Sequence, residues 1–247
     1  TAPDEGQIYF AGRHMQENDI GQIGYLPEER GLYKKMKVGE QALYLAQLKG
    51  MSRHDAMIAL KQWFEKFDIG NWWNKKVEEL SKGMQQKVQF IITVLHQPRL
   101  LIFDEPFSGF DPINVNILKQ EILRLRDNGS TIIFSTHNMA SVEELCDNIA
   151  LINRSRKILE GNVMDIRKGQ RTETWEVEIS GVNPASLQLP GSFRVLETDE
   201  AGGRSLIKIQ GSVNHKSNEL LVGLVSQGEV HAFREILPTM NDIFIAT

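Results

Sequence analysis

The order of apolar and polar positions divides the chain into segments of different periodicity. Two short candidate strands lie at residues 7–10 and 22–25, and a polar loop from Pro27 to Gly31 follows them. From Lys34 to Gln97 the pattern is helical, because apolar residues recur at spacings of three and four and draw one stripe on a helix. The stripe consists of Ala56, Met57, Leu60, Trp63, Phe64 and Phe67. We interpret its aromatic side chains as core residues rather than as a ligand site.

Two continuous apolar runs follow, at residues 100–103 and 131–134, with a helical segment from Ile113 to Asp127 between them. Such runs fill the middle of a parallel sheet, and strand, helix, strand at this spacing predicts an α/β unit. Ligand sites of open parallel sheets gather at the carboxyl ends of the strands, so we expect the functional site there. A helix that starts near Met139 and a strand at 149–152 complete this part.

The pattern changes after about Lys168. Residues 175–179 and 206–209 alternate as strands do, and Gly202-Gly203 is a plausible turn. A helix near 218–226, a strand near 230–233 and a closing helix from Pro238 are expected after it. We therefore predict two domains, residues 1–167 and a small mixed α/β accessory domain at 168–247.

Composition narrows the class of protein. The chain has 247 residues, 41% of them hydrophobic and 24% charged, which is enough for one good core and a smaller unit. No apolar run approaches the roughly 18 residues of a membrane-spanning helix. A net charge of -4 without a long basic run argues against a nucleic-acid partner. The single cysteine, Cys146, excludes an internal disulfide and fits a reducing compartment.

The first of the two buried runs ends in adjacent acids, Asp104 and Glu105. Successive strand residues point to opposite sides, so the two carboxylates can take different roles. One suits Mg²⁺ bridged to phosphate, and the other suits a general base that polarises water. A strand that simply meets a solvated acidic loop gives the same local pattern.

Three further motifs surround these acids in a fixed order. LSKGMQQ stands at residues 80–86, SGFD at 108–111, and His137 closes the second buried run. In this order the chain resembles an ABC ATPase, an α/β protein with a P-loop NTPase-like core and a helical subdomain, here at about 34–97. The resemblance covers nearly the whole length, and Lys82 and Met84 depart from the family's glycine and glutamine.

The resemblance implies roles for individual residues. It makes Glu105 the catalytic carboxylate and His137 the switch histidine, and it assigns metal binding to Asp104 and Glu28, the latter in place of the family's glutamine. Contacts to ATP are implied for a set of residues that includes the motif opening a helix: Ser81, Lys82, Gly83, Met84 and Asp111. ATP and Mg²⁺ are the implied substrate and cofactor.

The resemblance also implies partners: a second ATPase subunit and transmembrane permease subunits, with the protein peripheral on the cytoplasmic face of the cell membrane. The sequence of residues 25–33 is similar to sequences of the family branch that serves drug-, sodium- or polysaccharide-type exporters. The alternative is a soluble ABC ATPase of DNA repair or of translation. An ABC ATPase of DNA repair would need a long coiled-coil insertion between Glu28 and Ser81, and one of translation usually has two tandem cassettes, so neither fits this chain as well.

One expected element is missing from the sequence. None of its 20 glycines begins the Gly, four residues, Gly-Lys-Ser/Thr pattern that cradles phosphate. We expect the chain to start after that loop, as an N-terminally truncated cassette, and the missing strand to have lain beside the Asp104 strand. Alone, the chain is expected to bind MgATP poorly. A pseudo-ATPase that only docks a partner remains the alternative.

Overall fold

The computed structural model describes residues 3, 5–28, 31–212 and 217–246. Contacts divide the chain into two compact units, residues 1–137 and 138–247, and each is described by itself. This division falls earlier than the domain boundary that the sequence suggests at 167/168, because residues from 139 onward pack with the C-terminal helix. The boundary at 167/168 stays a prediction.

The first unit is built on a three-stranded parallel sheet. Its strands are β3 (Ile23–Leu26), β4 (Leu100–Asp104) and β5 (Thr131–Ser135), in the order β3-β4-β5. Leu26 is in register with Phe103, and Phe103 with Phe134. The two apolar runs are thus neighbouring strands, and all three strands end at one edge. The run at 131–134 was expected to fill the middle of a sheet, but β5 is an edge strand and none of its residues is buried.

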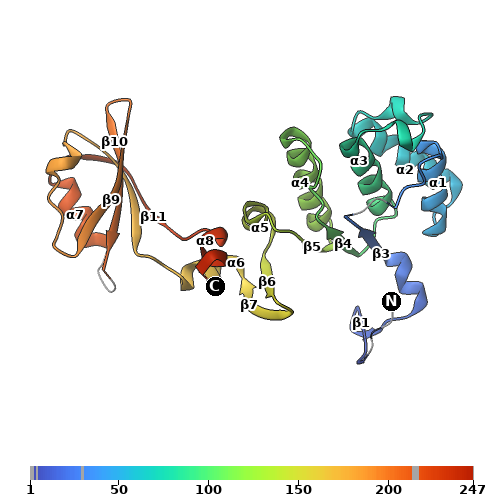
Figure 1. The fold of residues 1–247 in the computed structure, drawn as a ribbon, viewed down its shortest axis with the longest axis horizontal. Coiled ribbons are helices and arrows are strands. Elements are labelled where there is room, and N and C mark those ends of the chain that lie inside the picture. Colours follow the sequence, from blue (N-terminus) through green and yellow to red (C-terminus); the bar gives the residue numbers. More distant parts are fainter. Residues whose placement is uncertain (1–2, 4, 29–30, 213–216, 247) are drawn as a thin grey trace. The chain divides into compact units, whose positions relative to one another are not determined.

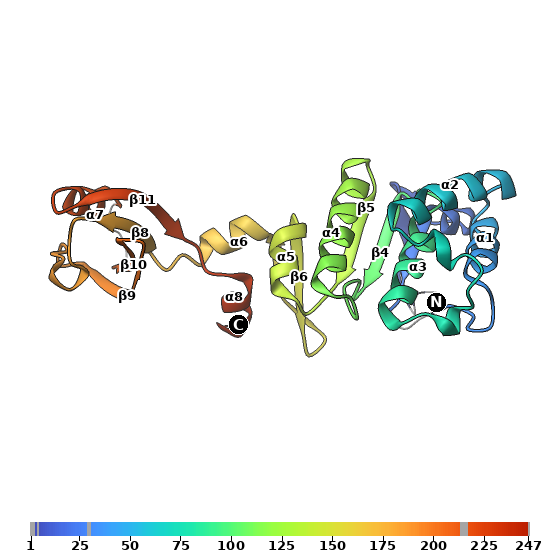
Figure 2. The same cartoon turned by 90° about the horizontal axis from the view of Figure 1, so that it is seen from above.

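Helices cover this sheet and form the helical part of the unit. They are α1 (Val38–Leu48), α2 (Arg53–Lys66), α3 (Lys82–Val94) and α4 (Pro112–Asp127). Ser52 caps α2 and Asp111 caps α4, and a proline at the first helical position supports the start of α4. Figures 1 and 2 show α3 beside β3 and α4 beside β5, in agreement with their contacts.

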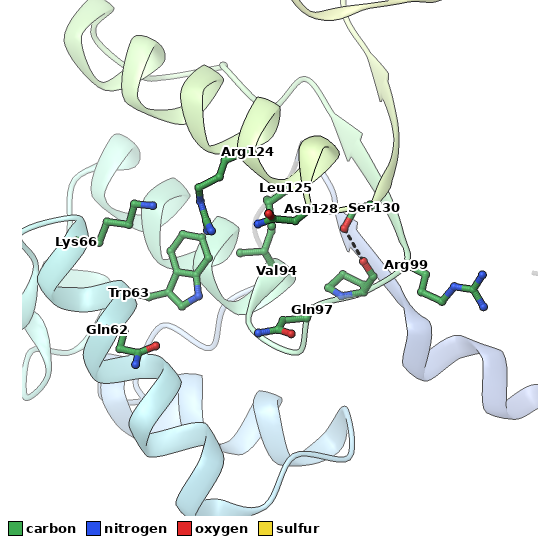
Figure 3. Close-up of a pocket in the computed structure, with 12 residues that line it drawn as sticks. Gln62, Trp63, Lys66, Val94, Gln97, Arg99, Arg124, Leu125, Asn128 and Ser130 are labelled. Carbon is green, nitrogen blue, oxygen red and sulfur yellow. Dashed lines mark hydrogen bonds between the residues drawn. The ribbon is translucent and has the colours of Figure 1, made fainter.

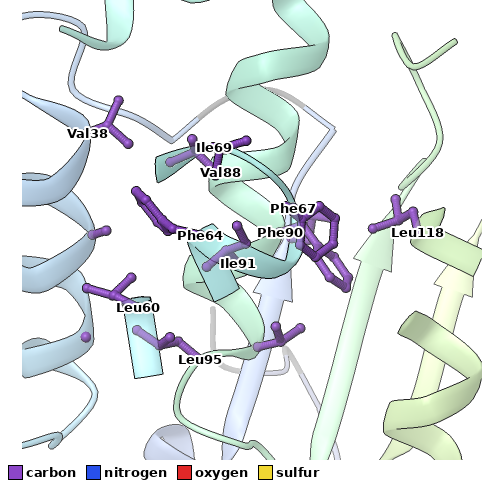
Figure 4. Close-up of a cluster of buried hydrophobic side chains, with 14 of the residues drawn as sticks. Val38, Leu60, Phe64, Phe67, Ile69, Val88, Phe90, Ile91, Leu95 and Leu118 are labelled. Atoms are coloured by element: carbon purple, nitrogen blue, oxygen red, sulfur yellow. The ribbon is translucent and has the colours of Figure 1, made fainter. Parts of the chain in front are cut away.

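One hydrophobic core joins these helices to the sheet (Figure 4). Phe90 of α3 packs 5.8 Å from Phe103 of β4, measured between ring centroids. Most of the predicted apolar stripe is buried here, which confirms that it is core. Trp63 is only partly buried, at the border of the core, and Met57 is 41% exposed, because it follows Ala56 by one residue and is turned about 100° from that face.

The open edges of the sheet differ from the expectation. The missing strand was expected beside the Asp104 strand, but β4 is central and pairs with both β3 and β5. Within the described residues β5 pairs with β4 alone, and its Ile133 is 55% exposed. An unpaired sheet edge therefore lies along β5, where unsatisfied backbone groups invite another strand.

The start of the first unit forms a small hairpin that the sequence only partly predicted. β1 (Tyr9–Phe10) pairs with β2 (Arg13–His14), and a 3-10 helix, η1 (Glu17–Gln22), leads into β3. Arg13 forms a two-pronged ion pair with the buried carboxylate of Asp19, at 2.9 and 2.6 Å. This contact fixes η1 before the sheet begins.

The second unit contains a hairpin and three short helices around a small core. β6 (Asn148–Asn153) pairs with β7 (Arg156–Asn162), and the helices are α5 (Met139–Leu145), α6 (Val163–Gly169) and α8 (Met240–Ala246). Val142, Val163, Met240 and Ile243 are buried together. The predicted helix after Met139 and the closing helix after Pro238 are thus packing partners.

The remainder of the second unit is an antiparallel sheet in the order β11-β8-β10-β9. Its elements are β8 (Thr174–Ser180), β9 (Phe193–Ala201), β10 (Arg204–Gly211), α7 (Ser217–Val225) and β11 (Glu229–Ile236). Gly202 and Gly203 form the turn between β9 and β10 with φ of 62° and 79°, a conformation that glycine adopts without strain. The mixed α/β character predicted for this part is confirmed.

Candidate functional site

The carboxyl edge of the β3-β4-β5 sheet collects most of the residues singled out from the sequence. β4 ends at Asp104 and Glu105 follows it, while β5 ends at Ser135 and is followed by Thr136 and His137. Because the strands are parallel and in register, these residues meet at one edge. This is the location that the sequence predicted for the site.

Asp104 lies half-buried at the last position of β4. The hydroxyl of Ser135, its register partner on β5, donates a hydrogen bond to Asp104 Oδ1. A hard cation bound also to phosphate and water would find here the oxygen ligand that Mg²⁺ prefers.

Glu105 stands just beyond the strand with a left-handed backbone, φ 44°. A non-glycine residue is strained by about 1–2 kcal/mol in this region, and such strain is often found at functional sites. The backbone N–H of Glu105 donates to Ser135 O at 3.0 Å, which holds the turn in place. The direction of its side chain thus follows from this turn and not, as the sequence suggested, from strand alternation.

Three donors on the next strand end surround the Glu105 carboxylate. His137 Nδ1 lies 2.6 Å from Oε1, the His137 backbone N–H donates to the same oxygen at 2.9 Å, and Thr136 Oγ1 donates to Oε2 at 3.2 Å. The glutamate side chain is 19% exposed and the histidine side chain 90%. The carboxylate is therefore held from inside, while the imidazole reaches solvent and is able to turn toward a ligand.

The start of α3 carries the LSKGMQQ motif. Ser81 caps the helix and accepts from the Met84 amide at 3.3 Å, so the amides of Lys82 and Gly83 occupy the first turn, where no intrahelical acceptor exists. A Cβ added at Gly83 would lie 3.0 Å from Gly109 O, and one at Gly109 would lie 3.0 Å from the Lys82 stem. The glycines therefore allow the helix start to pack tightly against the SGFD loop.

Two of the residues expected to contact ATP have clear structural partners. The Met84 side chain packs against the hydrophobic core. Asp111 caps α4 by accepting from the amides of Ile113 at 3.1 Å and Asn114 at 3.0 Å. The hydrogen bonds from Asn114 hold the pKa of Asp111 below its ordinary value. Nucleotide contacts by Met84 and Asp111 stay predictions.

Glu28 lies exposed two residues beyond the end of β3. Residues 29 and 30 of its loop fall outside the described part of the chain. Within that part, no three side chains of His, Cys, Asp or Glu converge as a metal-binding group. A metal site here would therefore need oxygens from phosphate or water in addition to Asp104, and the role of Glu28 stays a prediction.

The sequence marked the polar ends of the two strands but did not assign partners to the two acids. The structure brings Ser135 to Asp104 and Thr136 to Glu105. The sequence did carry a signal for these two contacts, because Ser135 and Thr136 lie between the apolar run at 131–134 and His137. The contact between Gly83 and Gly109 had no such signal.

A hollow of about 520 Å³ opens at the opposite edge of the same sheet, near the starts of β4 and β5 (Figure 3). Arg124 lies over the ring of Trp63 at 5.6 Å, and Ser130 Oγ donates to Pro98 O at 2.9 Å. None of the predicted site residues lines it. The hollow and the acidic edge are thus separate features of the sheet.

Nucleotide-binding α/β proteins have such a site at the carboxyl edge of a parallel sheet, where acids, hydroxyls and an imidazole meet. They also have a helix start whose amides are available to an anion. Comparison with known proteins narrows this class. A family model described as "ABC transporter" matches residues 1–108, and another, described as "ATP-binding protein DrrA1-3-like, C-terminal domain", matches residues 161–247.

A match over nearly the whole of this chain comes from Bacillus subtilis (strain 168). Its uncharacterised ABC transporter ATP-binding protein YhaQ is 41% identical over 249 residues, which cover 98% of this chain and 79% of YhaQ. The chain belongs to the family of ABC transporter ATP-binding proteins.

Two further comparisons agree with this assignment. The lantibiotic transport ATP-binding protein SrtF of Streptococcus pyogenes is 34% identical over 155 residues, covering 63% of this chain and 66% of SrtF. A solved structure described as "Structure of ATP binding subunit of ABC transporter" matches with a TM-score of 0.62 and 29% identity, over 68% of this chain and 71% of that chain. The predicted ABC ATPase fold is thereby confirmed.

Proposed function

We propose that this protein is the ATP-hydrolysing subunit of an ABC exporter, and that closure of two such subunits on ATP drives transport through transmembrane permease partners. The observation that carries the proposal is the hydrogen-bonded set of Glu105, Thr136 and His137 beside Asp104 at one sheet edge. Export is supported by the resemblance to the exporter branch and by the similarity to SrtF, a lantibiotic transport protein.

Glu105 acts as the general base in this proposal. Its carboxylate takes a proton from water while the water oxygen bonds to the γ-phosphorus, and the bond from that phosphorus to the β–γ bridging oxygen breaks to release ADP. The hydrogen bonds from Thr136 and His137 orient the carboxylate before the reaction. His137 Nδ1 must leave Glu105 for that oxygen to accept from water.

Its exposed imidazole then reaches the γ-phosphate. His137 stabilises charge there and keeps the attacking water in line. Asp104 is the residue that would hold Mg²⁺, through the oxygen that does not accept from Ser135. The metal ion offsets phosphate charge when it is bound.

The start of α3 serves the second subunit of the pair. The amides of Lys82 and Gly83, with the partial positive charge of a helix N-terminus, suit the γ-phosphate of ATP held by the facing subunit. Tight packing of Gly83 on Gly109 ties this helix start to the loop that follows Glu105. Closure of the dimer would thus bring both halves of the site to one phosphate.

The protein is proposed to work at the cytoplasmic face of the membrane, held there by its permease partners. Within the described residues no helix is both long and apolar enough to cross a bilayer. Transport energy is passed on by a change of shape that ATP binding favours. The helical part around α1 and α2 is the proposed route to the permease.

A non-hydrolysing interaction subunit is the alternative to this proposal. The 247 residues contain no Gly, four residues, Gly-Lys-Ser/Thr sequence, and so lack the amides and lysine that cradle phosphates in P-loop proteins. We expect this chain alone to bind MgATP weakly and to hydrolyse it negligibly. Micromolar binding of ATP to it would contradict that expectation.

ATP turnover by the gene's complete product, assembled with its permease, separates the two candidates. The exporter proposal predicts ATP turnover above background by this complex, because the two subunits held in it complete each site. A complex that forms normally and releases no phosphate above background would favour the interaction subunit.

A further inference from the structure

Two lysine-rich segments of the first unit, residues 34–38 and 75–78, lie side by side where α1 begins. Their backbones run antiparallel, and the amide of Val38 donates to Lys75 O at 2.9 Å. Every lysine of the two segments is exposed. We name these side chains the five-lysine patch: Lys34, Lys35, Lys37, Lys75 and Lys76.

The pairing of the two segments places like charges against each other. Lys37 stands directly opposite Lys76, an arrangement that destabilises an antiparallel pair. Lys37 Nζ lies 3.9 Å from Glu40 Oε1, and Lys76 Nζ lies 3.7 Å from Glu78 Oε1. All four of these side chains are exposed, and ion pairs at exposed sites contribute little. The two glutamates therefore offset the repulsion only in part.

The other three lysines of the patch lack an acidic partner. Lys34, Lys35 and Lys75 form no ion pair within the described part of the chain. The remaining acid nearby is Glu79, whose carboxylate accepts from the backbone N–H of Lys76 at 2.5 Å. Three ammonium groups are thus available to an anion from outside the chain.

The patch reverses the sign of the charge locally. Residues 34–40 and 75–79 hold five lysines and three glutamates, which leaves a net charge of +2, whereas the whole chain has a net charge of -4. A positive surface on a negative protein selects an anionic partner and favours one orientation toward it.

The fold holds the patch in place. The amide of Tyr33, next to Lys34, donates to Oε1 of the fully buried Gln41 at 2.5 Å. The amide of Gly39 donates to Trp73 O at 3.0 Å. The lysine backbones are therefore fixed on both sides, and binding does not require the segments to become ordered first.

The kind of side chain distinguishes between an anionic lipid surface and an acidic protein surface. Lysine is depleted in protein–protein interfaces, where arginine is enriched, and the patch consists of lysine alone. Clusters of four to eight basic residues beside a membrane are typical of contacts with anionic lipid. Tyr33, directly before Lys34, is 56% exposed, and tyrosine is enriched at the boundary between membrane and water. These features favour the lipid surface.

We propose that the five-lysine patch binds the anionic lipid headgroups of the membrane on which the transporter works. This inference rests on the proposed function, which places the protein at that membrane beside its permease. Headgroup phosphates accept hydrogen bonds from the ammonium groups and relieve the repulsion between them. The contact with lipid adds to the contact with the permease, so anionic lipid raises the fraction of subunits that are docked.

The first test measures co-sedimentation of the complete subunit with vesicles in the absence of the permease. The vesicles consist of phosphatidylcholine alone or of phosphatidylcholine with about 30% phosphatidylglycerol, at low and at high salt. The variant is Lys34→Gln/Lys35→Gln/Lys75→Gln. A control with the same loss of charge is Lys61→Gln/Lys157→Gln/Lys168→Gln, whose three lysines are exposed on α2, β7 and α6.

The wild type should bind the anionic vesicles more tightly than the neutral ones, and high salt should abolish the difference. A lysine near such a surface contributes about fivefold in binding, so the patch variant should bind the anionic vesicles roughly 10²-fold more weakly. The control variant should stay within about threefold of the wild type, and both should keep its thermal midpoint, since exposed side chains are exchanged. Equal binding of the wild type to both vesicles, or an equal loss in the two variants, would overturn the proposal.

A second test separates lipid from permease. The permease is placed in nanodiscs of the same two lipid compositions, and binding of the subunit to them is measured. The patch variant should bind more weakly than the wild type only in the anionic discs. An equal loss in the neutral discs would assign the patch to an acidic surface of the permease and would overturn the proposal.

ATP turnover in the same discs keeps this inference separate from the proposed function. If the wild type binds anionic vesicles through the patch but its complex hydrolyses no ATP, the proposed function fails and the patch stands. A complex that hydrolyses ATP while the wild type shows no preference for anionic lipid would contradict the patch alone.

Discussion

Charged side chains lie on two surfaces of the molecule, and the partners of their acidic residues differ. On the β11-β8-β10-β9 sheet, acids face cations across the strands: Glu178 meets Arg204 at 2.7 Å and Glu197 meets Lys208 at 2.5 Å. At the carboxyl edge of the β3-β4-β5 sheet, Asp104 and Glu105 have no lysine or arginine in contact among the described residues.

The partners change what the acids can do. The hydrogen bond from Arg204 holds the pKa of Glu178 below its ordinary value, so this carboxylate stays ionised and fixed in a cross-strand pair. Hydroxyl, amide and imidazole donors orient Glu105 without neutralising its charge. The acids of the first surface are held in ion pairs, whereas those of the second have no lysine or arginine partner among the described residues, as the proposed metal binding and proton transfer require.

Replacing Glu105 on the second surface should have the largest effect on ATP turnover. Glu105→Gln keeps the shape of the side chain but removes its basicity, so ATP turnover in the complete subunit should fall by about 10²–10⁴-fold. Thermal stability should stay close to wild type, because the amide oxygen can still accept from Thr136 or His137. Phosphate release at saturating ATP measures the loss, with Glu160→Gln as the control acid, and a loss below threefold would refute the assignment of Glu105.

The next largest effect is expected where the helix start meets the SGFD loop. Gly83→Ala places a Cβ 3.0 Å from Gly109 O, so one of the two backbones must shift. Turnover should fall roughly tenfold, since small displacements of positioning groups carry large kinetic effects. Gly70→Ala meets nothing within 4 Å and should leave turnover unchanged. Equal rates for the two variants would show that tight packing at Gly83 is not needed.

A smaller, pH-dependent effect is expected away from both surfaces, at His96. Burial, with a contribution from the nearby charge of Lys49, lowers the pKa of this histidine from 6.5 to about 4. The unfolded chain therefore binds a proton between these values that the folded chain does not. The free energy of unfolding should rise with pH from about 4 to 6.5 and then level off.

Denaturant titrations at pH 5 and pH 7 check this dependence. The wild type should gain stability between the two values, and His96→Gln should gain less, because its side chain does not titrate. An identical gain in both proteins would mean that other groups account for the pH dependence.

The smallest effect is expected on the accessory sheet. Arg204→Gln removes one cross-strand ion pair at an exposed site, where such pairs contribute little. The denaturation midpoint should hardly move, and ATP turnover in the complete subunit should equal that of the wild type. A loss of turnover comparable to that of Gly83→Ala would mean that the two surfaces are not as different as their partners suggest.

The strands, the helices and the edge that carries the site depend on local sequence pattern, and these features were predicted. The run at residues 100–103 is apolar because β4 is the central strand of a packed sheet, and the polar ends of the runs at 100–103 and 131–134 mark one edge of that sheet. The helix predicted from Ile113 to Asp127 is present as α4, although the cap at Asp111 was not predicted from the aspartate and proline that precede it. Asp104 and Glu105 were singled out from the polar end of a run and His137 from the order of the motifs, and their roles stay predictions.

Other features depend on contacts between residues that are distant in the sequence, and these features could not be predicted. The order of the strands, with β5 at an edge, reflects pairing that periodicity does not encode. The left-handed backbone of Glu105 occurs together with a hydrogen bond from its amide to the carbonyl of Ser135 on the neighbouring strand. The hydrogen bond from the Met240 amide to Glu143 joins residues 97 positions apart. Met57 was misassigned because a stripe read from spacing is wider than the face that is buried.

The most direct measurement is an experimental structure of the complete subunit with Mg²⁺ and a non-hydrolysable ATP analogue. Our account predicts Asp104 on the metal ion, Glu105 and His137 on the γ-phosphate side, and the Ser81 helix start of a second subunit facing the same phosphate. A γ-phosphate bound away from Asp104, Glu105 and His137 would contradict it.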